Sequence, residues 1–124
     1  MIIVSLHGGL GNQMFQYAAG RALAARTKSI LKLDLTFLEK CILGRDVDYR
    51  KYGLNSFRIE ENIINEDELA GFIGISKIFF RLKLSWLNKK MDYFLPIPVI
   101  YNQTGLGYNP EFSKLNKNTY LVGY

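Results

Sequence analysis

The sequence predicts an α/β fold built around a parallel sheet. Residues 2–6 form a continuous apolar run rich in β-branched side chains, which is typical of a strand covered on both faces. A glycine-rich turn at residues 8–11 follows directly, and residues 13–26 are then rich in alanine and other good helix formers. Residues 29–35 alternate between apolar and polar side chains, as a second strand does. This order makes a βαβ unit, which we expect to be right-handed.

The composition fits one compact domain. Of the 124 residues, 48% are hydrophobic and 22% are charged, so the chain can bury a core and is not expected to be disordered. Sixteen Lys and Arg against eleven Asp and Glu give a net charge of +5, which favours an anionic partner. Cys41 is the single cysteine, so no internal disulfide can form and a reducing compartment is expected. The sequence shows neither a signal peptide nor a stretch of ~20 apolar residues, and we predict a cytoplasmic protein.

The predicted helix over residues 13–26 has two distinct faces. One face is polar or small and consists of Gln13, Gln16, Gly20 and Ala24. The opposite face consists of Met14, Tyr17, Ala18, Ala22 and Ala25. The small residues of this second face predict that it packs closely against the sheet. Asn12 stands where an N-cap residue is expected.

The rest of the chain is predicted to contain further short helices and strands. Glu66–Phe72 is predicted as a short helix capped by Asn65, and a longer helix is predicted from Ser76 to Met91. Residues 99–102 and 119–124 are predicted as short strands with a loop between them. The sequence stops inside this last apolar run, where a βαβ layout predicts a following helix. We therefore expect the sequence to be truncated.

The glycine-rich turn either holds a ligand or serves as a purely structural bend. Backbone N–H groups at such a turn point toward a ligand, and the helix dipole adds partial positive charge, which suits a phosphate. Gly9 and Gly11 match two glycines of the dinucleotide fingerprint, and Asp34 follows roughly 20 residues later, as a ribose-binding acid does. Met14 replaces the third glycine, and the sequence has no Gly-Lys-Ser/Thr phosphate loop. A Rossmann dinucleotide-binding fragment therefore stays an alternative.

The string GGLGNQMFQYAAGRALA, at residues 8–24, closely resembles the N-terminal signature of the bacterial α-1,2-fucosyltransferases, glycosyltransferase family 11. The strings LDLTFL, RKYGLNSFRI and YLVGY follow in the order and spacing of that family. The resemblance implies an inverting GT-B enzyme with two Rossmann-like lobes. Such an enzyme transfers L-fucose from GDP-fucose to the 2-hydroxyl of a terminal galactose on a glycan acceptor. The resemblance implies no metal and no cofactor beyond the donor substrate.

Residues 1–124 would then form the N-terminal, acceptor-side lobe of such an enzyme. The family holds the donor nucleotide mainly in the C-terminal lobe, through a His-x-Arg-Arg-x-Asp motif. This sequence has no Arg-Arg pair, and its one histidine is His7. The resemblance therefore predicts that the donor-binding lobe is missing here and that the 124-residue chain is inactive by itself.

The same resemblance places the glycine-rich turn in the cleft between the lobes. The substrate-binding residues predicted there are Gly8, Gly9, Gly11, Asn12 and Gln13. Asn12 and Gln13 would hydrogen-bond sugar hydroxyls or phosphate oxygens, whereas the structural alternatives are turn glycines and a simple N-cap. His7 is a candidate general base because histidine titrates at about pH 6.5, although the family signature does not require it.

A basic stretch gives a third, non-enzymatic interpretation. Its cations are interleaved with the aromatic residues Phe79, Phe80 and Trp86, which predicts a basic amphipathic helix that binds a membrane surface. The cations are Lys77, Arg81, Lys83, Lys89 and Lys90. A solvated helix face is the competing interpretation. No recognisable RNA- or DNA-binding motif accompanies the stretch, so no nucleic-acid partner is predicted.

Overall fold

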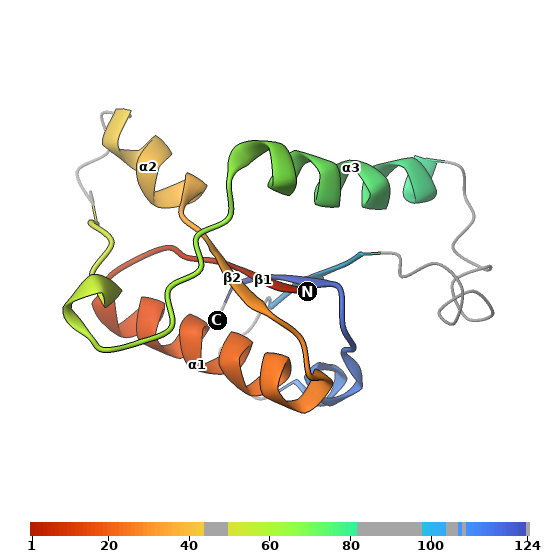
Figure 1. The fold of residues 1–124 in the computed structure, drawn as a ribbon, viewed down its shortest axis with the longest axis horizontal. Helices are drawn as coiled ribbons and strands as arrows, with labels where there is room; N and C mark the ends of the chain where they lie inside the picture. Colours follow the sequence, from red (N-terminus) through yellow and green to blue (C-terminus); the bar gives the residue numbers. More distant parts are fainter. Residues whose placement is uncertain (44–49, 82–97, 104–106, 108, 124) are drawn as a thin grey trace.

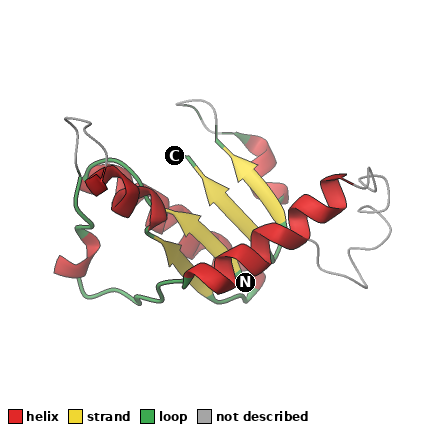
Figure 2. Cartoon of the chain, turned by 90° about the horizontal axis from the view of Figure 1, so that it is seen from above, coloured by secondary structure: helices red, strands yellow, loops and turns green. Residues whose placement is uncertain are grey.

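The chain folds around a four-stranded parallel sheet, as Figure 2 shows. This computed structural model describes residues 1–43, 50–81, 98–103, 107 and 109–123. The strands are β1 (Ile2–Ser5), β2 (Leu31–Asp34), β3 (Val99–Asn102) and β4 (Thr119–Val122). They are arranged in the order β2-β1-β4-β3, and every neighbouring pair is parallel. The predicted α/β class is confirmed, and so are the four predicted strands.

Helices lie on both faces of the sheet (Figure 1). The helix α1 (Leu10–Thr27) follows β1, α2 (Thr36–Leu43) follows β2, and α3 (Glu66–Arg81) covers the face opposite α1. Successive side chains of a strand point to opposite faces, so β1 contributes to two apolar clusters. Ile2 and Val4 pack on the α1 side, and Ile3 packs with Phe72 of α3 on the other. A central strand covered on both faces explains the continuous apolar run at the start of the sequence.

The structure corrects the predicted packing face of α1. The residues of α1 that are buried are Gln13, Gln16, Gly20, Leu23 and Ala24. On the face predicted to pack, Met14 is 46% exposed, and Ala18, Ala22 and Ala25 are exposed as well, whereas Tyr17 is half-buried and packs against the core. The reason is steric, because a Cβ at Gly20 would lie 2.2 Å from Cγ2 of Val4. The glycine therefore brings the helix against β1 on the face that sequence pattern alone marks as polar.

The start of α1 also differs from the prediction. The helix begins at Leu10 rather than Gln13, and its N-cap is Gly9, which makes no side-chain cap bond. Asn12 lies inside the first turn, so its predicted N-cap role is wrong. The chain turns early because Gly8 adopts a φ of 75°, and the amide of Gln13 already bonds the carbonyl of Gly9 at 3.1 Å.

At its other end α1 stops at a residue that carries a conformational cost. Lys28 has a φ of 50° and a ψ of 46°, the left-handed region that glycine adopts without penalty. Lys28→Gly is therefore expected to raise the free energy of unfolding by about 0.5–1 kcal/mol, measured by urea denaturation. Ala22→Gly, on the exposed side of the same helix, should lower it by about 1 kcal/mol. Equal effects of the two glycines would contradict the strain at Lys28.

Residues 66–81, which the sequence divides between two predicted helices, form the single helix α3. The predicted cap is confirmed, since Oδ1 of Asn65 accepts a hydrogen bond from the amide of Glu68 at 2.8 Å. Gly74, which lies between the two predicted helices, is inside α3 and does not interrupt it. Residues 76–81 are the last part of α3, and residues 82–91 of the predicted second helix lie outside the described residues.

Candidate functional site

The glycine-rich loop lies at the carboxyl end of β1, where open parallel sheets bind their ligands. Its glycines differ in what they do. Gly8 is needed for the turn, because its φ is positive and a Cβ there would lie 2.6 Å from Nδ2 of Asn12. A Cβ built on Gly9 or Gly11 meets no described atom within 4 Å. These two glycines leave the backbone open to close approach by a ligand.

Gln13 is held entirely by backbone groups. Its side chain is fully buried, at 0% exposure. Its Nε2 donates to the carbonyls of Gly8 and Lys51, each at 2.9 Å, and its Oε1 accepts from the amide of Gly53 at 3.0 Å. Both amide hydrogens are thereby used inside the protein. The structure thus shows the Gln13 side chain bonded inside the protein, and the sugar or phosphate contact predicted for it from the sequence stays a prediction.

Gln16 binds the residue that precedes the loop. Its Oε1 accepts from the amide of His7 at 3.0 Å, and its Nε2 donates to the carbonyl of His7 at 3.3 Å. This side chain is 2% exposed. Its amide satisfies the backbone N–H and C=O of His7 in the way that the backbone of a neighbouring strand would. Sequence reasoning placed Gln16 on a polar face and missed this role. The signal that points to it is the recurrence of two glutamines one turn apart directly after a glycine turn.

His7 is a half-buried side chain beside the loop. Its ring packs edge-to-face against Phe37 of α2, with 5.4 Å between ring centroids. Burial lowers the pKa of His7 below its usual 6.5, against a smaller opposing effect of a hydrogen bond involving the Ser5 backbone. The imidazole is therefore neutral at physiological pH, which is the form that accepts a proton. The geometry thus keeps His7 as a candidate general base.

Asn12 is placed differently from its neighbour Gln13. It lies in the first turn of α1, half-buried, with its side-chain amide over Gly8. Among the described residues, the Asn12 amide makes no side-chain hydrogen bond, whereas that of Gln13 makes three. Within the predicted set, Asn12 therefore has the amide that remains available to a ligand.

A buried polar cluster lies at the carboxyl edge of the sheet on the α3 side. The carboxylate of Asp34 is 3% exposed, and its Oδ1 accepts from the amide of Thr36 at 2.9 Å and from the Thr36 hydroxyl. Its Oδ2 accepts from the hydroxyl of Tyr120 at 2.7 Å. Burial and this bond raise the pKa of Tyr120 to about 12. Asp34 is the strand-end acid that its position indicated, and both of its oxygens are used internally.

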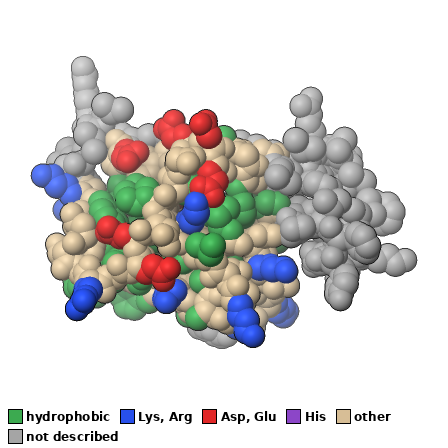
Figure 3. Space-filling model, in the orientation of Figure 1, with side chains coloured by type: hydrophobic (Ala, Val, Ile, Leu, Met, Phe, Trp, Pro, Cys, Tyr) green, Lys and Arg blue, Asp and Glu red, His purple; other side chains and the backbone are tan. Residues whose placement is uncertain are grey.

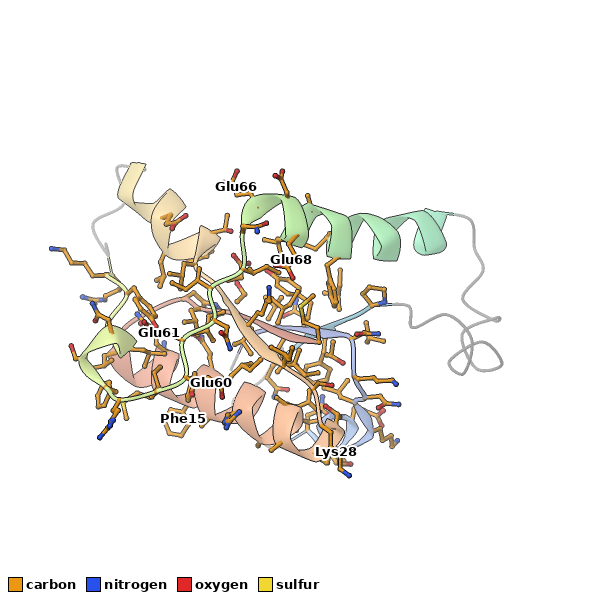
Figure 4. The ribbon with its side chains drawn as sticks, viewed as in Figure 1. Phe15, Lys28, Glu60, Glu61, Glu66 and Glu68 are labelled. Atoms are coloured by element: carbon orange, nitrogen blue, oxygen red, sulfur yellow. The ribbon has the colours of Figure 1, made fainter. Side chains whose placement is uncertain are left out.

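A cavity of about 220 Å³ lies on the α1 side of the sheet. Its walls come from α1, from the carboxyl ends of β3 and β4, and from the segment between them. They include Phe15, Ala19, Tyr101, Phe112 and Leu121. Phe15 is 75% exposed and points away from the sheet beside α1 (Figure 4). The predicted glycine-loop residues are not among those that line this cavity.

The basic stretch is described only in part. Lys77 and Arg81 lie on α3, while Lys83, Lys89 and Lys90 lie outside the described residues. The described start of α3 is acidic, with Glu66, Asp67 and Glu68 in its first turn, and acidic side chains gather there in Figure 3. Glu68 points toward the sheet and forms an ion pair with Lys32, whereas Glu66 points outward (Figure 4). No helix within the described residues combines the length and apolar character needed to span a membrane.

Metal ligands do not gather in the part of the chain that the structure describes. Within residues 1–39, 50–74, 98–103, 107 and 109–123, whose side chains the structure describes, no three His, Cys, Asp or Glu side chains are grouped as a metal site requires.

Comparison with known proteins gives one short, specific similarity. An α-1,2-colitosyltransferase from Escherichia coli is 57% identical to this chain over 35 residues. These residues are 28% of this chain and 12% of that enzyme, so the match spans a small part of the curated relative. No protein-family model matches the chain, and the comparison with solved structures gave no match. The similarity supports a transferase of the glycosyltransferase kind.

Proposed function

We propose that this chain is the acceptor-side, Rossmann-like lobe of a GT-B glycosyltransferase that transfers L-fucose from GDP-fucose to the 2-hydroxyl of a terminal galactose. The observation that carries the proposal is the glycine loop, whose open backbone lies at the carboxyl edge of the sheet. Buried glutamines hold the start of the loop, where Gln13 bonds Gly8 and Gln16 bonds the preceding residue, His7. The 57% identity to a colitosyltransferase over 35 residues points to the same class of reaction.

The loop supplies what an acceptor needs in such a reaction. The acceptor hydroxyl has to be aligned behind the anomeric carbon of the donor, and a fixed loop provides that alignment. The backbone at Gly9 and Gly11 lets a sugar ring approach closely, and the Asn12 amide offers hydrogen bonds to its hydroxyls. His7, neutral at physiological pH, is the candidate that takes the hydroxyl proton. Stabilisation of the departing diphosphate is assigned to a separate donor-binding lobe.

The dinucleotide alternative fits this geometry less well. A ribose-binding acid needs a carboxylate that faces the ligand, and the carboxylate of Asp34 is 3% exposed with both oxygens already bonded. Saturable NAD binding that is lost in Asp34→Asn would favour that alternative over the transferase.

Binding of a galactoside to the loop tests the proposal directly. In a ¹⁵N-labelled chain, lactose is expected to shift the amides of Gly9, Gly11 and Asn12 saturably, whereas maltose, which lacks galactose, leaves them unchanged. Asn12→Ala should weaken lactose binding by about 2- to 10-fold, because one neutral hydrogen bond contributes about 1 kcal/mol. Ala18→Ser, on an exposed part of α1, is the matched control and should bind as the native chain does.

A transfer assay tests the division into lobes. The chain incubated with GDP-fucose and lactose is expected to yield no fucosylated product by mass spectrometry. Product formation would contradict the need for a separate donor lobe, and lactose shifts confined to residues remote from the loop would contradict the site.

A further inference from the structure

We propose that residues 51–53 form a second wall of the candidate site, and that Gln13 is the positioning residue that holds this wall against the glycine loop. The inference rests on the proposed function, because it assigns a further part of the same acceptor site. Its basis is the bonding of the Gln13 side chain, which joins Gly8 on one side to Lys51 and Gly53 on the other.

The first step concerns the geometry of these bonds. The carbonyl oxygens of Gly8 and Lys51 both lie 2.9 Å from the same atom, Nε2 of Gln13. Two chain segments that are far apart in sequence therefore meet at one nitrogen. The amide of Gly53 closes the arrangement from the other end of the side chain, at 3.0 Å from Oε1. A planar amide with three bonds of this length leaves the two segments little freedom to move separately.

The second step concerns the cost of burying this side chain. A buried amide is unfavourable unless its donors and acceptor are all satisfied, and an apolar side chain of the same length would fill the same space. A glutamine at 0% exposure thus contributes geometry rather than hydrophobic burial. Its three hydrogen bonds fix the backbone of the loop at Gly8 relative to the backbone of residues 51–53.

Packing supports the same assignment. A Cβ at Gly53 would lie 3.0 Å from Cδ1 of Leu10, so the backbone of the wall approaches the first residue of α1 closely. Leu54, the next residue, is buried in the main core, and the hydroxyl of Tyr52 bonds the carboxylate of Glu61. Residues 51–53 are therefore held by contacts with the core and with Glu61, in addition to those with Gln13. The Lys51 side chain is exposed to solvent, while its backbone carbonyl bonds Gln13.

Gln16 provides a matched control inside the same helix. It is buried to a similar degree and also bonds only backbone groups, but both of its partners belong to His7. Replacing either glutamine by methionine removes an amide from the same face of α1. Only the change at Gln13 releases residues 51–53.

Amide hydrogen exchange followed by NMR tests this difference. In Gln13→Met the protection of the Gly53 amide is expected to fall at least about tenfold while that of His7 changes little, and in Gln16→Met the reverse is expected. Leu23→Ala, a core change elsewhere on α1, should lower the protection of both amides together. Protection of Gly53 that is unchanged in Gln13→Met, or that falls equally in Gln16→Met, would overturn the proposal.

Gln13→Glu keeps the inference testable if the methionine variant does not fold. The carboxyl would face the carbonyls of Gly8 and Lys51, which raises its pKa in the folded state. Its neutral form can still donate one hydrogen bond to a carbonyl, whereas the ionised carboxylate donates none and is repelled by both carbonyls. Protection of the Gly53 amide should therefore be near native at pH 4 and should be lost as the pH rises through that raised value. A pH-independent loss would overturn the positioning role.

Lactose binding, followed by amide chemical shifts, tests whether residues 51–53 belong to the candidate site. In the native chain, lactose should shift the amides of residues 51–53 together with those of residues 9–12, and in Gln13→Met the shifts should be confined to residues 9–12. Undiminished shifts of residues 51–53 in Gln13→Met would overturn the second wall. If lactose shifts neither segment of the native chain, the proposed function fails, while the exchange pattern still decides whether Gln13 holds the two segments together.

Discussion

Replacing Gly20 by valine is expected to lower the free energy of unfolding by about 3 kcal/mol, the upper part of the range for overpacked cores. Even the first added carbon would lie 2.2 Å from Cγ2 of Val4 and 3.0 Å from Cδ1 of Leu31. Both side chains belong to the core, and Val4 is 1% exposed, so neither can move aside without displacing others. Relief comes only by moving α1 away from the sheet, which also displaces Gln13 and Gln16 on the same face.

Gly71→Val is the matched control for this prediction. Gly71 also lies inside a helix, but it is exposed, and a Cβ there meets no described atom within 4 Å. Its replacement should change the free energy of unfolding by no more than about 0.5 kcal/mol in urea denaturation. A further variant, Gly20→Val with Val4→Ala, should be more stable than the sum of the single changes implies. Simple additivity would contradict the steric explanation.

Removing the carboxylate of Asp34 is the second change with a large expected effect. Asp34→Ala should cost about 3 kcal/mol, because hydrogen bonds to a charged group are strong and their donors stay behind without a partner. Those donors are the amide and hydroxyl of Thr36 and the hydroxyl of Tyr120. Tyr120 lies on β4 and Asp34 on β2, so the bond spans β1 and ties the sheet together at its carboxyl edge.

Thermal and urea unfolding of two comparison variants checks this prediction. Asp67→Ala, in the exposed first turn of α3, should stay within about 0.5 kcal/mol of the native chain. Tyr120→Phe should cost about 1–2 kcal/mol by itself and little more when Asp34 is already alanine. Full additivity of the two changes would contradict the bond between them.

The dependence of stability on alkaline pH is an independent test of the hydrogen bond from Tyr120 to Asp34. Tyr120 has a pKa of about 12 in the folded chain against about 10 in the unfolded one, so the folded state holds its proton more tightly. This contribution to stability is present below pH 10 and is lost as the pH rises from 10 through about 12. The alkaline loss should be smaller in Tyr120→Phe than in the native chain. Identical pH profiles would contradict the bonded, neutral hydroxyl.

Much of the secondary structure is predictable because its signals are local. The apolar runs of β1 and β4 and the asparagine before α3 each act on their own neighbours in sequence. The packing face of α1 is not predictable in this way. A glutamine looks polar in a helical pattern, and the partners that allow Gln13 to be buried, Lys51 and Gly53, come from a distant loop.

The candidate site also contains residues that the sequence predicts and residues whose role depends on tertiary contacts. The glycines and Asn12 are recognisable from one continuous string, and the structure places them together at the end of β1. The role of Gln13 and the bond from Tyr120 to Asp34 depend on contacts 38 to 86 residues apart in sequence. Spacing along a chain does not report such contacts, so neither was found by pattern.

The sequence by itself determined the βαβ start, the position of the glycine loop and the family of enzymes that this loop resembles. These features depend on backbone preferences and on short-range spacing, which act within a few residues. Only the tertiary structure decided which face of α1 meets the sheet, which loop glycines stay open, and which distant backbone groups hold Gln13 and Gln16. The physical reason is that close packing at Gly20 and the need to satisfy every buried amide are conditions on the folded chain as a whole.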